Sequence, residues 1–381
     1  MSSQTNELIL RGGRVIDPAR QIDATLDLLF RDGRLREISP TVVPAPSARM
    51  QDVTGCIVTP GLIDLHTHVY WGGTSLGVDP IDLARRGATA VLVDAGSSGP
   101  ANFAGFRAHV IEPSLPLKIL PLLNLSFAGI FGFSRAVMVG ESEDIRLLDL
   151  RECVRVVREH ADLIVGIKVR VGRVASGTAG IAPLDMALEV AEEVGLPVMA
   201  HLDFPPPSRR DVVSRLRAGD ILTHCFRPFP NAPSAPGGGV RQEILEARDR
   251  GVIFDIGHGG GSLGFATSRA MLDAGFKPDV ISSDVHALSI NGPAYHLLHT
   301  LAKFYALGMS LSDVIACATI NPARALRQPE LGSLEPGVAT DASVFQVMRL
   351  PTDYADVMGE TLEGAAAFQP RGLVLAGKWW N

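Results

Sequence analysis

Two histidines two residues apart mark the stretch with the clearest chemical content. His66 and His68 follow an apolar, β-branched run over 57–65 that predicts a buried strand. Because side chains alternate along a strand, Asp64, His66 and His68 should face one side. Neutral imidazole nitrogen is a good ligand for zinc and related metals, so the pair predicts a metal site. The alternative is two histidines near a strand end, each bonded to a carbonyl group.

A lysine is expected to face the same site from a later strand. Over 164–171, aliphatic residues alternate with Gly166, Lys168 and Arg170, so the aliphatic set should pack against helices and Lys168 should point inward. Burial lowers the pKa of a lone lysine and leaves a neutral amine available for chemistry. Carbamylation by carbon dioxide would convert this amine into a carboxylate able to bridge two metal ions.

Three more potential ligands each come directly after an apolar, strand-like run. They are His201, His224 and Asp284. Each of them, taken alone, is more often structural than functional. Six such residues in this order, each associated with an expected strand, are instead expected to share one site.

The segment from Thr59 to about Leu326 alternates strand-like and helix-like stretches, the latter including 144–160 and 294–307. Strands buried on both faces and alternating with helices predict an α/β fold, a (β/α)8 TIM barrel, with a doubly wound open sheet as the competitor. We favour the barrel because polar residues end several different strands, where barrel active sites are built. The expected strands are 57–66, 89–94, 117–124, 164–171, 197–201, 220–225, 252–256 and 279–284.

Both ends of the chain are rich in short strands. The N-terminal part contains a turn signal, Asp32-Gly33, between two apolar runs, and strand-like runs return at 342–347 and 372–376. We therefore predict a small β-sandwich domain built from both chain termini. Its expected residues are 1–58 and 329–381, beside a barrel of residues 59–328.

Composition narrows the classes of protein and partner. Hydrophobic residues make up 46% and charged residues 20% of the 381 residues, and the net charge of −6 is spread without a basic block. The four cysteines are far apart, which is typical of buried thiols in a reducing compartment. Residues 1–7 are polar and carry no signal-peptide core, and the apolar stretch 119–133, broken by Pro121, is too short to span a bilayer. We expect a cytoplasmic protein with a small-molecule substrate and with neither nucleic acid nor a membrane as partner.

Together these features resemble the amidohydrolase superfamily of metal-dependent hydrolases, in its dihydroorotase-like amidohydrolase and deacetylase branch. The resemblance covers almost the whole chain and includes Thr59-Pro-Gly-Leu-Ile-Asp-Leu-His-Thr-His68 and the tail Asn321-Pro-Ala-Arg324 followed by 332–342. It implies two divalent metal ions, with zinc expected and manganese, iron or nickel as alternatives. It is also compatible with a homo-oligomer, since the fold often occurs in symmetric assemblies.

The resemblance assigns a role to each candidate ligand. His66 and His68 would bind one metal ion with Asp284. His201 and His224 would bind the second. Lys168, N6-carboxylated, would bridge both.

The mechanism implied by the resemblance is attack by a hydroxide held between the two metal ions, which lower the pKa of bound water. Asp284 would take the proton during attack and pass it to the leaving group. Asp64 either orients one of the histidines or is a buried aspartate bonded to backbone.

The substrate class rests on fewer residues. Dihydroorotases commonly place an arginine two residues after the second histidine, whereas Val69-Tyr70 stands here. The chain is more similar to deacetylases, so we predict cleavage of an amide or ester bond in a small acylated, anionic substrate, an N-acyl amino acid or O-acyl hydroxy acid. Ring opening of a cyclic amide, as by a dihydroorotase or hydantoinase, is the alternative. Arg170 and His286 are candidate substrate contacts, unless Arg170 is held in a buried ion pair.

Three further functions compete with a metal-dependent hydrolase. Gly73-Thr-Ser75-Leu-Gly77 matches the serine hydrolase motif, but it does not sit directly between a strand and a helix. The glycines over 259–264 match a dinucleotide fingerprint without its βαβ context, and His258 beside them is a weaker site candidate. A non-enzymatic scaffold on the same fold would be expected to lose metal ligands, and all six positions are filled here.

Overall fold

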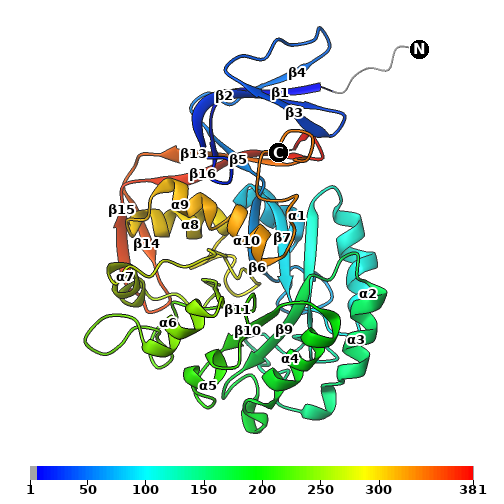
Figure 1. The fold of residues 1–381 in the computed structure, drawn as a ribbon, viewed down its shortest axis with the longest axis vertical. Coiled ribbons are helices and arrows are strands. Elements are labelled where there is room, and N and C mark those ends of the chain that lie inside the picture. Colours follow the sequence, from blue (N-terminus) through cyan, green and yellow to red (C-terminus); the bar gives the residue numbers. More distant parts are fainter. Residues whose placement is uncertain (1–6, 381) are drawn as a thin grey trace.

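The computed structural model describes residues 7–380. The expectation that residues 1–7 contain no secretory signal concerns residues that, apart from Glu7, lie outside this range. Within the range, the chain folds into a ring of parallel strands surrounded by helices, and a sheet made from the two chain ends lies across one end of that ring (Figure 1).

Seven parallel strands form a continuous sheet in the order β12-β11-β10-β9-β8-β7-β6. The segment 280–285 closes the ring, because Asp255 bridges to Val280 on one side and Thr67 bridges to Val285 on the other. This confirms the barrel type of fold over the open sheet. The strands are β6 Leu62–Thr67, β7 Thr89–Ala95, β8 Lys118–Asn124, β9 Gly166–Val171, β10 Val198–Leu202, β11 Ile221–Leu222 and β12 Ile253–Phe254.

The closing strand is less regular than its apolar sequence predicts. Over 279–284 the structure contains the single bridge at Val280 and no named strand, and β11 and β12 have two residues each. Asp284 and His224 both have positive φ angles, 47° and 63°, so the backbone turns out of the strand direction at the predicted ligands. Such backbone interrupts ladder pairing, and it is concentrated at functional sites in proteins.

The helices cover the outside of the ring, and their boundaries follow capping residues. The predicted helix 144–160 is divided, because Asp144 caps a 3₁₀ turn at Ile145–Leu147 and Asp149 then caps α3 through the amide of Glu152. The helices are α1 Pro80–Gly87, α2 Phe103–Phe106, α3 Leu150–Glu159, α4 Ala182–Val194, α5 Arg209–Val213, α6 Gln242–Asp249, α7 Phe265–Asp273, α8 Leu297–Ala306, α9 Leu311–Ala316 and α10 Ile320–Ala325.

Strands from both chain ends pair in one sheet, in the order β17-β16-β13-β5-β1-β2-β3, with β4 paired to β1. The predicted turn at Asp32-Gly33 joins β2 to β3 and has the two positive φ angles, 52° and 78°, of a tight hairpin. The strands are β1 Glu7–Asp17, β2 Ile22–Arg31, β3 Arg34–Ser39, β4 Arg49–Asp52, β5 Ile57–Pro60, β13 Ala342–Met348, β16 Ala367–Leu375 and β17 Lys378–Trp380.

A second hairpin, β14 Thr352–Ala355 with β15 Thr361–Gly364, was not predicted from the sequence. It extends from the terminal sheet along the outside of the barrel beside α8 (Figure 1). Its Tyr354 is buried. The hairpin therefore joins the C-terminal segment to the wall of the barrel.

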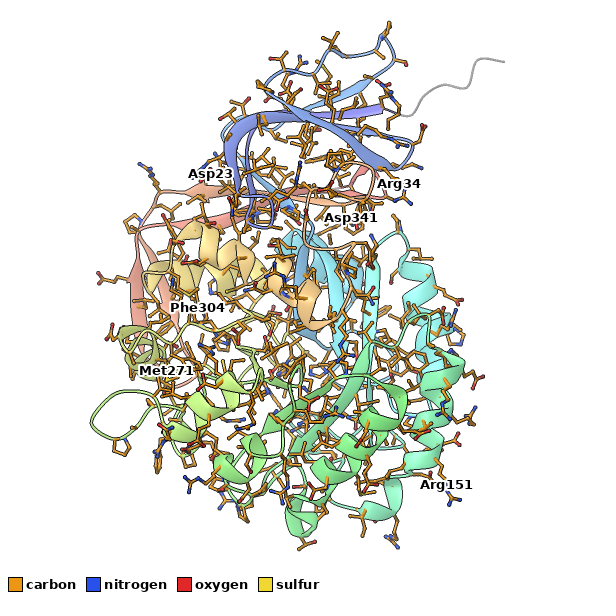
Figure 2. All side chains as sticks on the ribbon, in the orientation of Figure 1. Asp23, Arg34, Arg151, Met271, Phe304 and Asp341 are labelled. Atoms are coloured by element: carbon orange, nitrogen blue, oxygen red, sulfur yellow. The ribbon has the colours of Figure 1, made fainter. Side chains whose placement is uncertain are left out.

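Buried apolar side chains form one large cluster in the barrel and a smaller one in the terminal sheet. Phe304 and Met271 belong to the first and are buried inside the larger body, whereas Arg34 projects from the terminal sheet (Figure 2). Between residues 7 and 380, the chain contains no helix with the length and apolar character needed to cross a membrane.

Candidate active site

All eight residues predicted for the site line one cavity at the carboxyl ends of the barrel strands. Its volume is about 40 Å³. Leu76, Ile130 and Phe133 complete the walls. The eight predicted residues are His66, His68, Lys168, Arg170, His201, His224, Asp284 and His286.

The Asp284 carboxylate lies between two imidazoles. Its Oδ1 is 3.3 Å from Nε2 of His66 and 3.2 Å from Nε2 of His68. One potential ligand atom each from His66, His224 and Asp284 lies within 4.8 Å of the others, and the rings of His201 and His224 are 4.5 Å apart. These spacings bring imidazoles from both halves of the sequence to one point.

Hydrogen bonds on the far side of the rings aim Nε2 into the cavity. Nδ1 of His66 lies 2.9 Å from Oγ1 of Thr223, which itself donates to Asp255 at 2.7 Å. Nδ1 of His68 lies 2.9 Å from the hydroxyl of Ser97. Since a donor at Nδ1 leaves a lone pair at Nε2, these bonds favour the tautomer that binds metals.

His224 follows the same arrangement, because its Nδ1 lies 2.7 Å from the carbonyl oxygen of Gly257. Nε2 of His201 is buried and has no hydrogen-bond partner among the described residues. Burial lowers the pKa of both imidazoles well below the usual value, and that of His68 to about 3. Neutral rings with exposed lone pairs are what a metal ion requires.

Lys168 is fully buried among these rings. Its Nζ lies 3.3 Å from Nε2 of His66 and 3.2 Å from Sδ of Met199. Burial lowers its pKa to about 7, with the Asp284 carboxylate acting in the opposite direction. The amine is therefore partly neutral near pH 7 and able to act as a nucleophile.

Asp64 takes the second of its two expected roles. Its carboxylate accepts from the backbone amide of Ser283 at 2.8 Å and from the Ser283 hydroxyl at 2.5 Å. The rings of His66 and His68 have other partners, so Asp64 orients the closing segment and not an imidazole. Burial raises its pKa to about 7.

Arg170 was predicted either to contact the substrate or to be held in a buried ion pair. In the structure it lines the cavity and also forms an ion pair. Its Nη1 lies 3.1 Å from Oε2 of Glu141, which is fully buried, and its guanidinium stacks 5.2 Å from the Phe133 ring. Phe133 also packs against His286 with ring centroids 5.3 Å apart. Phe133 thus covers both predicted substrate contacts.

Several supporting residues were not predicted from the sequence. Asp94 and Asp255 end strand-like runs, so the signal used for Asp284 would have identified them. Asp94 accepts from the amides of Val69 and Ser97, which positions the segment around His68. Glu141 lies in an irregular loop with no periodic pattern.

The competing motifs have structural roles. The hydroxyl of Ser75 donates to the Phe133 carbonyl at 3.0 Å and lies outside any strand-to-helix elbow.

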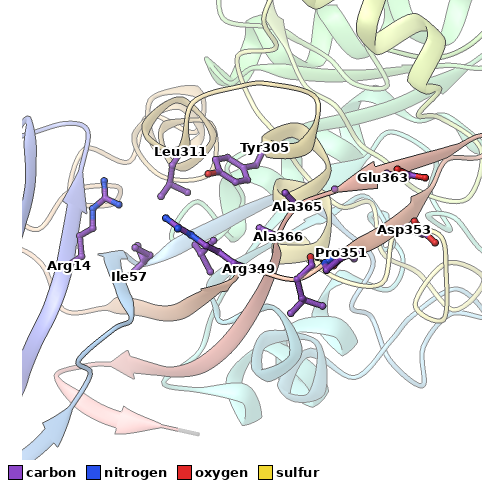
Figure 3. Close-up of a pocket in the computed structure, with 14 residues that line it drawn as sticks. Arg14, Ile57, Tyr305, Leu311, Arg349, Pro351, Asp353, Glu363, Ala365 and Ala366 are labelled. Atoms are coloured by element: carbon purple, nitrogen blue, oxygen red, sulfur yellow. Dashed lines mark hydrogen bonds between the residues drawn. The ribbon is translucent and has the colours of Figure 1, made fainter.

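A much larger cavity, of about 1070 Å³, lies between Arg14, Tyr305, Arg349 and the β14–β15 hairpin (Figure 3). None of the predicted site residues lines it.

Comparison with known proteins agrees with this geometry. Residues 262–379 match the model of the amidohydrolase family. A deacetylase of Brucella anthropi is 33% identical over 358 residues, covering 93% of this chain and 87% of that protein. A deacetylase of Agrobacterium fabrum is 33% identical over 353 residues, covering 91% and 84%. A crystal structure of a dihydroorotase superposes with a TM-score of 0.89 at 29% identity, covering 98% of both chains.

Proposed function

This chain belongs to the amidohydrolase superfamily and is a hydrolase of C–N bonds, and from that premise we propose that it removes the acyl group from a small N-acyl amino acid or O-acyl hydroxy acid with the aid of two divalent metal ions. The observation that carries the proposal is the convergence of eight predicted residues on one cavity. The deacetylase relatives, which match nearly the whole chain, support the acyl substrate.

The donor set fits metal ions. Three imidazoles have their Nδ1 atoms engaged and the fourth, His201, has a buried Nε2 that no group within residues 7–380 bonds. His66, His68 and Asp284 would hold one ion, and His201 and His224 the other, with zinc favoured by the imidazole-rich set. Bound divalent ions lower the pKa of water and polarise a carbonyl oxygen.

Lys168 would bridge the ions after carboxylation. Its neutral amine adds to carbon dioxide, one N–C bond forms and one amine proton is released, which leaves a carbamate anion. Burial and the lack of a carboxylate partner within salt-bridge distance among the described residues both favour the neutral amine that this reaction needs. The carbamate would neutralise part of the metal charge in a largely buried site.

The remaining residues act on water and substrate. Asp284, whose Oδ1 faces two imidazoles, would accept the proton of the attacking water and return it to the leaving nitrogen or oxygen. Arg170 and His286 would contact the substrate, with the Arg170 guanidinium turned by Glu141. Phe133 would exclude bulk water from the cavity.

A cyclic amidohydrolase is the second candidate, favoured by the similarity to the dihydroorotase structure. The tetrahedral attack would be the same, with the leaving nitrogen remaining attached to the product. The absence of an arginine at Val69-Tyr70 argues against dihydroorotate itself.

We further propose that the terminal strands form a separate β-sandwich domain of residues 1–58 and 329–381, beside the barrel of residues 59–328. The separate apolar cluster that contains Leu10, Phe30 and Val344 supports this division. We also propose a cytoplasmic location and a small molecule as the partner, as the spread of charge and the widely separated cysteines in the sequence suggest.

The test is a hydrolysis screen of protein purified with zinc and bicarbonate, with a chelator-treated control. The panel contains N-acetyl L- and D-amino acids, O-acetyl hydroxy acids, dihydroorotate and hydantoins. Chelator-sensitive release of acetate is the expected result. Turnover confined to the cyclic amides would replace the deacylase by the second candidate.

Metal content tests the site independently of the substrate. The wild-type protein should contain about two transition metal ions per chain, and His201→Ala should lose at least one of them. His109→Ala, in which an exposed histidine is removed, is the matched control. Fewer than about one ion per chain in the wild type would contradict the two-metal site.

A further inference from the structure

A second fully buried lysine, Lys303 on α8, lies outside the metal cavity and has three close acceptors. Its Nζ is 2.7 Å from Nε2 of His258, 2.8 Å from the carbonyl oxygen of Pro293 and 2.7 Å from that of Ala355. An ammonium group has three protons to donate, so all three are used. Lys168, in contrast, has beside its Nζ the Nε2 atom of His66 at 3.3 Å and the thioether sulfur of Met199 at 3.2 Å.

The proton inventory defines the state of His258. Its Nδ1 lies 2.9 Å from the carbonyl oxygen of Gly259, so Nδ1 carries the proton and Nε2 accepts from Lys303. Burial lowers the pKa of His258 well below the usual value, in agreement with a neutral ring. Burial also lowers the pKa of Lys303, to about 7, so below this pH the pair is an ammonium bound to a neutral imidazole, and above it the neutral amine still donates two of the three hydrogen bonds.

Lys303 joins three segments that are far apart in the sequence. His258 begins the glycine loop after β12, Pro293 ends the loop that carries Asp284 and His286, and Ala355 belongs to the β14–β15 hairpin. One ammonium group thus fixes the spacing of two loops at the mouth of the barrel and ties both to the C-terminal hairpin. Removing it would leave the buried Nε2 of His258 and two partly buried carbonyl oxygens without this donor.

The glycine loop in turn packs against Asp284. The amide of Gly259 donates to the carbonyl oxygen of Ser283 at 2.9 Å, and a Cβ atom at position 259 would overlap Oδ2 of Asp284. Asp284 has a φ of 47°, a strained angle for a residue other than glycine. Oδ1 faces the imidazoles, so the His258–Gly259 peptide forms the wall on the other side of the carboxylate.

We propose that Lys303 is a positioning residue that holds the His258–Gly259 peptide against Asp284 and thereby fixes the carboxylate for proton transfer. The kinetic part of this inference rests on the proposed hydrolase function. The positional part does not depend on it. The same contacts give the glycine loop after β12 a structural role that neither the serine hydrolase motif nor the dinucleotide fingerprint supplies.

The experiment compares four variants with the metal-loaded wild type. Lys303→Met should lower kcat for an N-acetyl amino acid about 10- to 100-fold with KM changed less than threefold, because small misplacement of a catalytic group lowers kcat by such factors. His258→Phe should behave similarly. His258→Gln, which offers an oxygen acceptor, should stay within threefold of the wild type. Lys277→Met, which removes an exposed lysine paired with Asp313, is the matched control.

The double variant Lys303→Met/His258→Phe separates positioning from folding. Replacing both polar partners by apolar groups should recover part of the thermal stability lost in either single variant. In a positioning role kcat stays low in the double variant. Recovery of kcat together with stability would overturn the proposal.

Hydrogen–deuterium exchange of the peptide 257–264 gives a readout that needs no substrate. Exchange should be at least tenfold faster in Lys303→Met than in the wild type and unchanged in Lys277→Met. Unchanged exchange in Lys303→Met would overturn the proposal whether or not the wild type hydrolyses any compound. Faster exchange in Lys303→Met, together with a wild type that hydrolyses none of the compounds, would support the positional role and reject the proposed function.

Discussion

Replacing Lys168 by methionine should stabilise the metal-free protein while abolishing its activity. Burial lowers the pKa of Lys168 from 10.5 to about 7, whereas the unfolded chain keeps its lysine charged. At about 1.4 kcal/mol per pH unit, this difference destabilises the metal-free folded state by roughly 4 kcal/mol at pH 7. Methionine has a similar length, no charge, and the thioether of Met199 beside it.

The pH dependence follows from the direction of the shift. Below pH 7 both states hold the proton and the penalty is constant. As the pH rises from 7 toward 10.5, the folded amine is already neutral and the unfolded lysine approaches its own pKa. The advantage of Lys168→Met should therefore fall from roughly 4 kcal/mol at pH 7 to roughly 2 kcal/mol at pH 9.

The assay is urea unfolding of chelator-treated wild type and Lys168→Met at both pH values, with metal content and hydrolysis measured on the reloaded proteins. Lys303→Met is a matched contrast, because burial lowers the pKa of Lys303 to about 7 as well, but the loss of its three hydrogen bonds should outweigh the relieved burial penalty and destabilise the protein. Activity of Lys168→Met should fall at least about 1000-fold, the order expected for removal of a group on which both metal ions depend. The reasoning would be refuted if the metal-free Lys168→Met protein were less stable than the metal-free wild type. It would also be refuted if Lys168→Met still bound two ions after metal reloading.

Three further predictions concern the surroundings of the site. Thr223→Val removes the hydrogen-bond partner of His66 Nδ1 and should weaken metal affinity about 10- to 100-fold in a chelator competition assay. Unchanged affinity would contradict the role of that hydrogen bond. Phe133→Ala should lower the KM for substrates with bulky acyl groups more than the KM for acetyl substrates. In the wild type the Phe133 ring covers a cavity of about 40 Å³, which is close to the size of one water molecule. Equal effects on both KM values would show that the ring does not limit access. Burial lowers the pKa of His296 to about 4 and that of His299 to about 3. As the pH falls below 6.5, the unfolded chain therefore binds protons at these two histidines before the folded protein does. Together the two histidines should lower the free energy of unfolding by about 2 kcal/mol between pH 7 and pH 5.5. His299→Gln should remove about half of that loss in urea titrations, and an unchanged pH dependence would show that His299 does not contribute.

The candidate site residues that line one cavity could be predicted from the sequence because each follows a local rule. His66 and His201 lie near the ends of apolar runs, and the alternation within the strand that contains Lys168 predicts that this side chain faces inward. Parallel strands carry such ends to one edge of a barrel, so convergence follows from topology without knowledge of the contacts. The hairpin at Asp32-Gly33 was identified for the same reason, since its turn chemistry is local.

Other features depended on contacts between distant segments. The 279–284 run has the composition of a strand, yet the bond from the Asp284 amide to the His66 carbonyl and the positive φ at Asp284 interrupt its ladder. The sequence left two roles open for Asp64, and only the position of Ser283 decided between them. The pairing of Arg170 with Glu141 brings together residues from a strand and an irregular loop.

The sequence by itself indicated the type of fold and the positions of the candidate ligands, because alternation and strand-end polarity are properties of short stretches of chain, and its motifs carried the resemblance to the family. The tertiary structure alone decided which partner each buried polar group has. Thr223 for His66, Glu141 for Arg170, and the three acceptors of Lys303 all lie many residues away in the sequence. A buried polar group must find a partner somewhere, but its identity depends on which distant segments the packed core brings within hydrogen-bond distance.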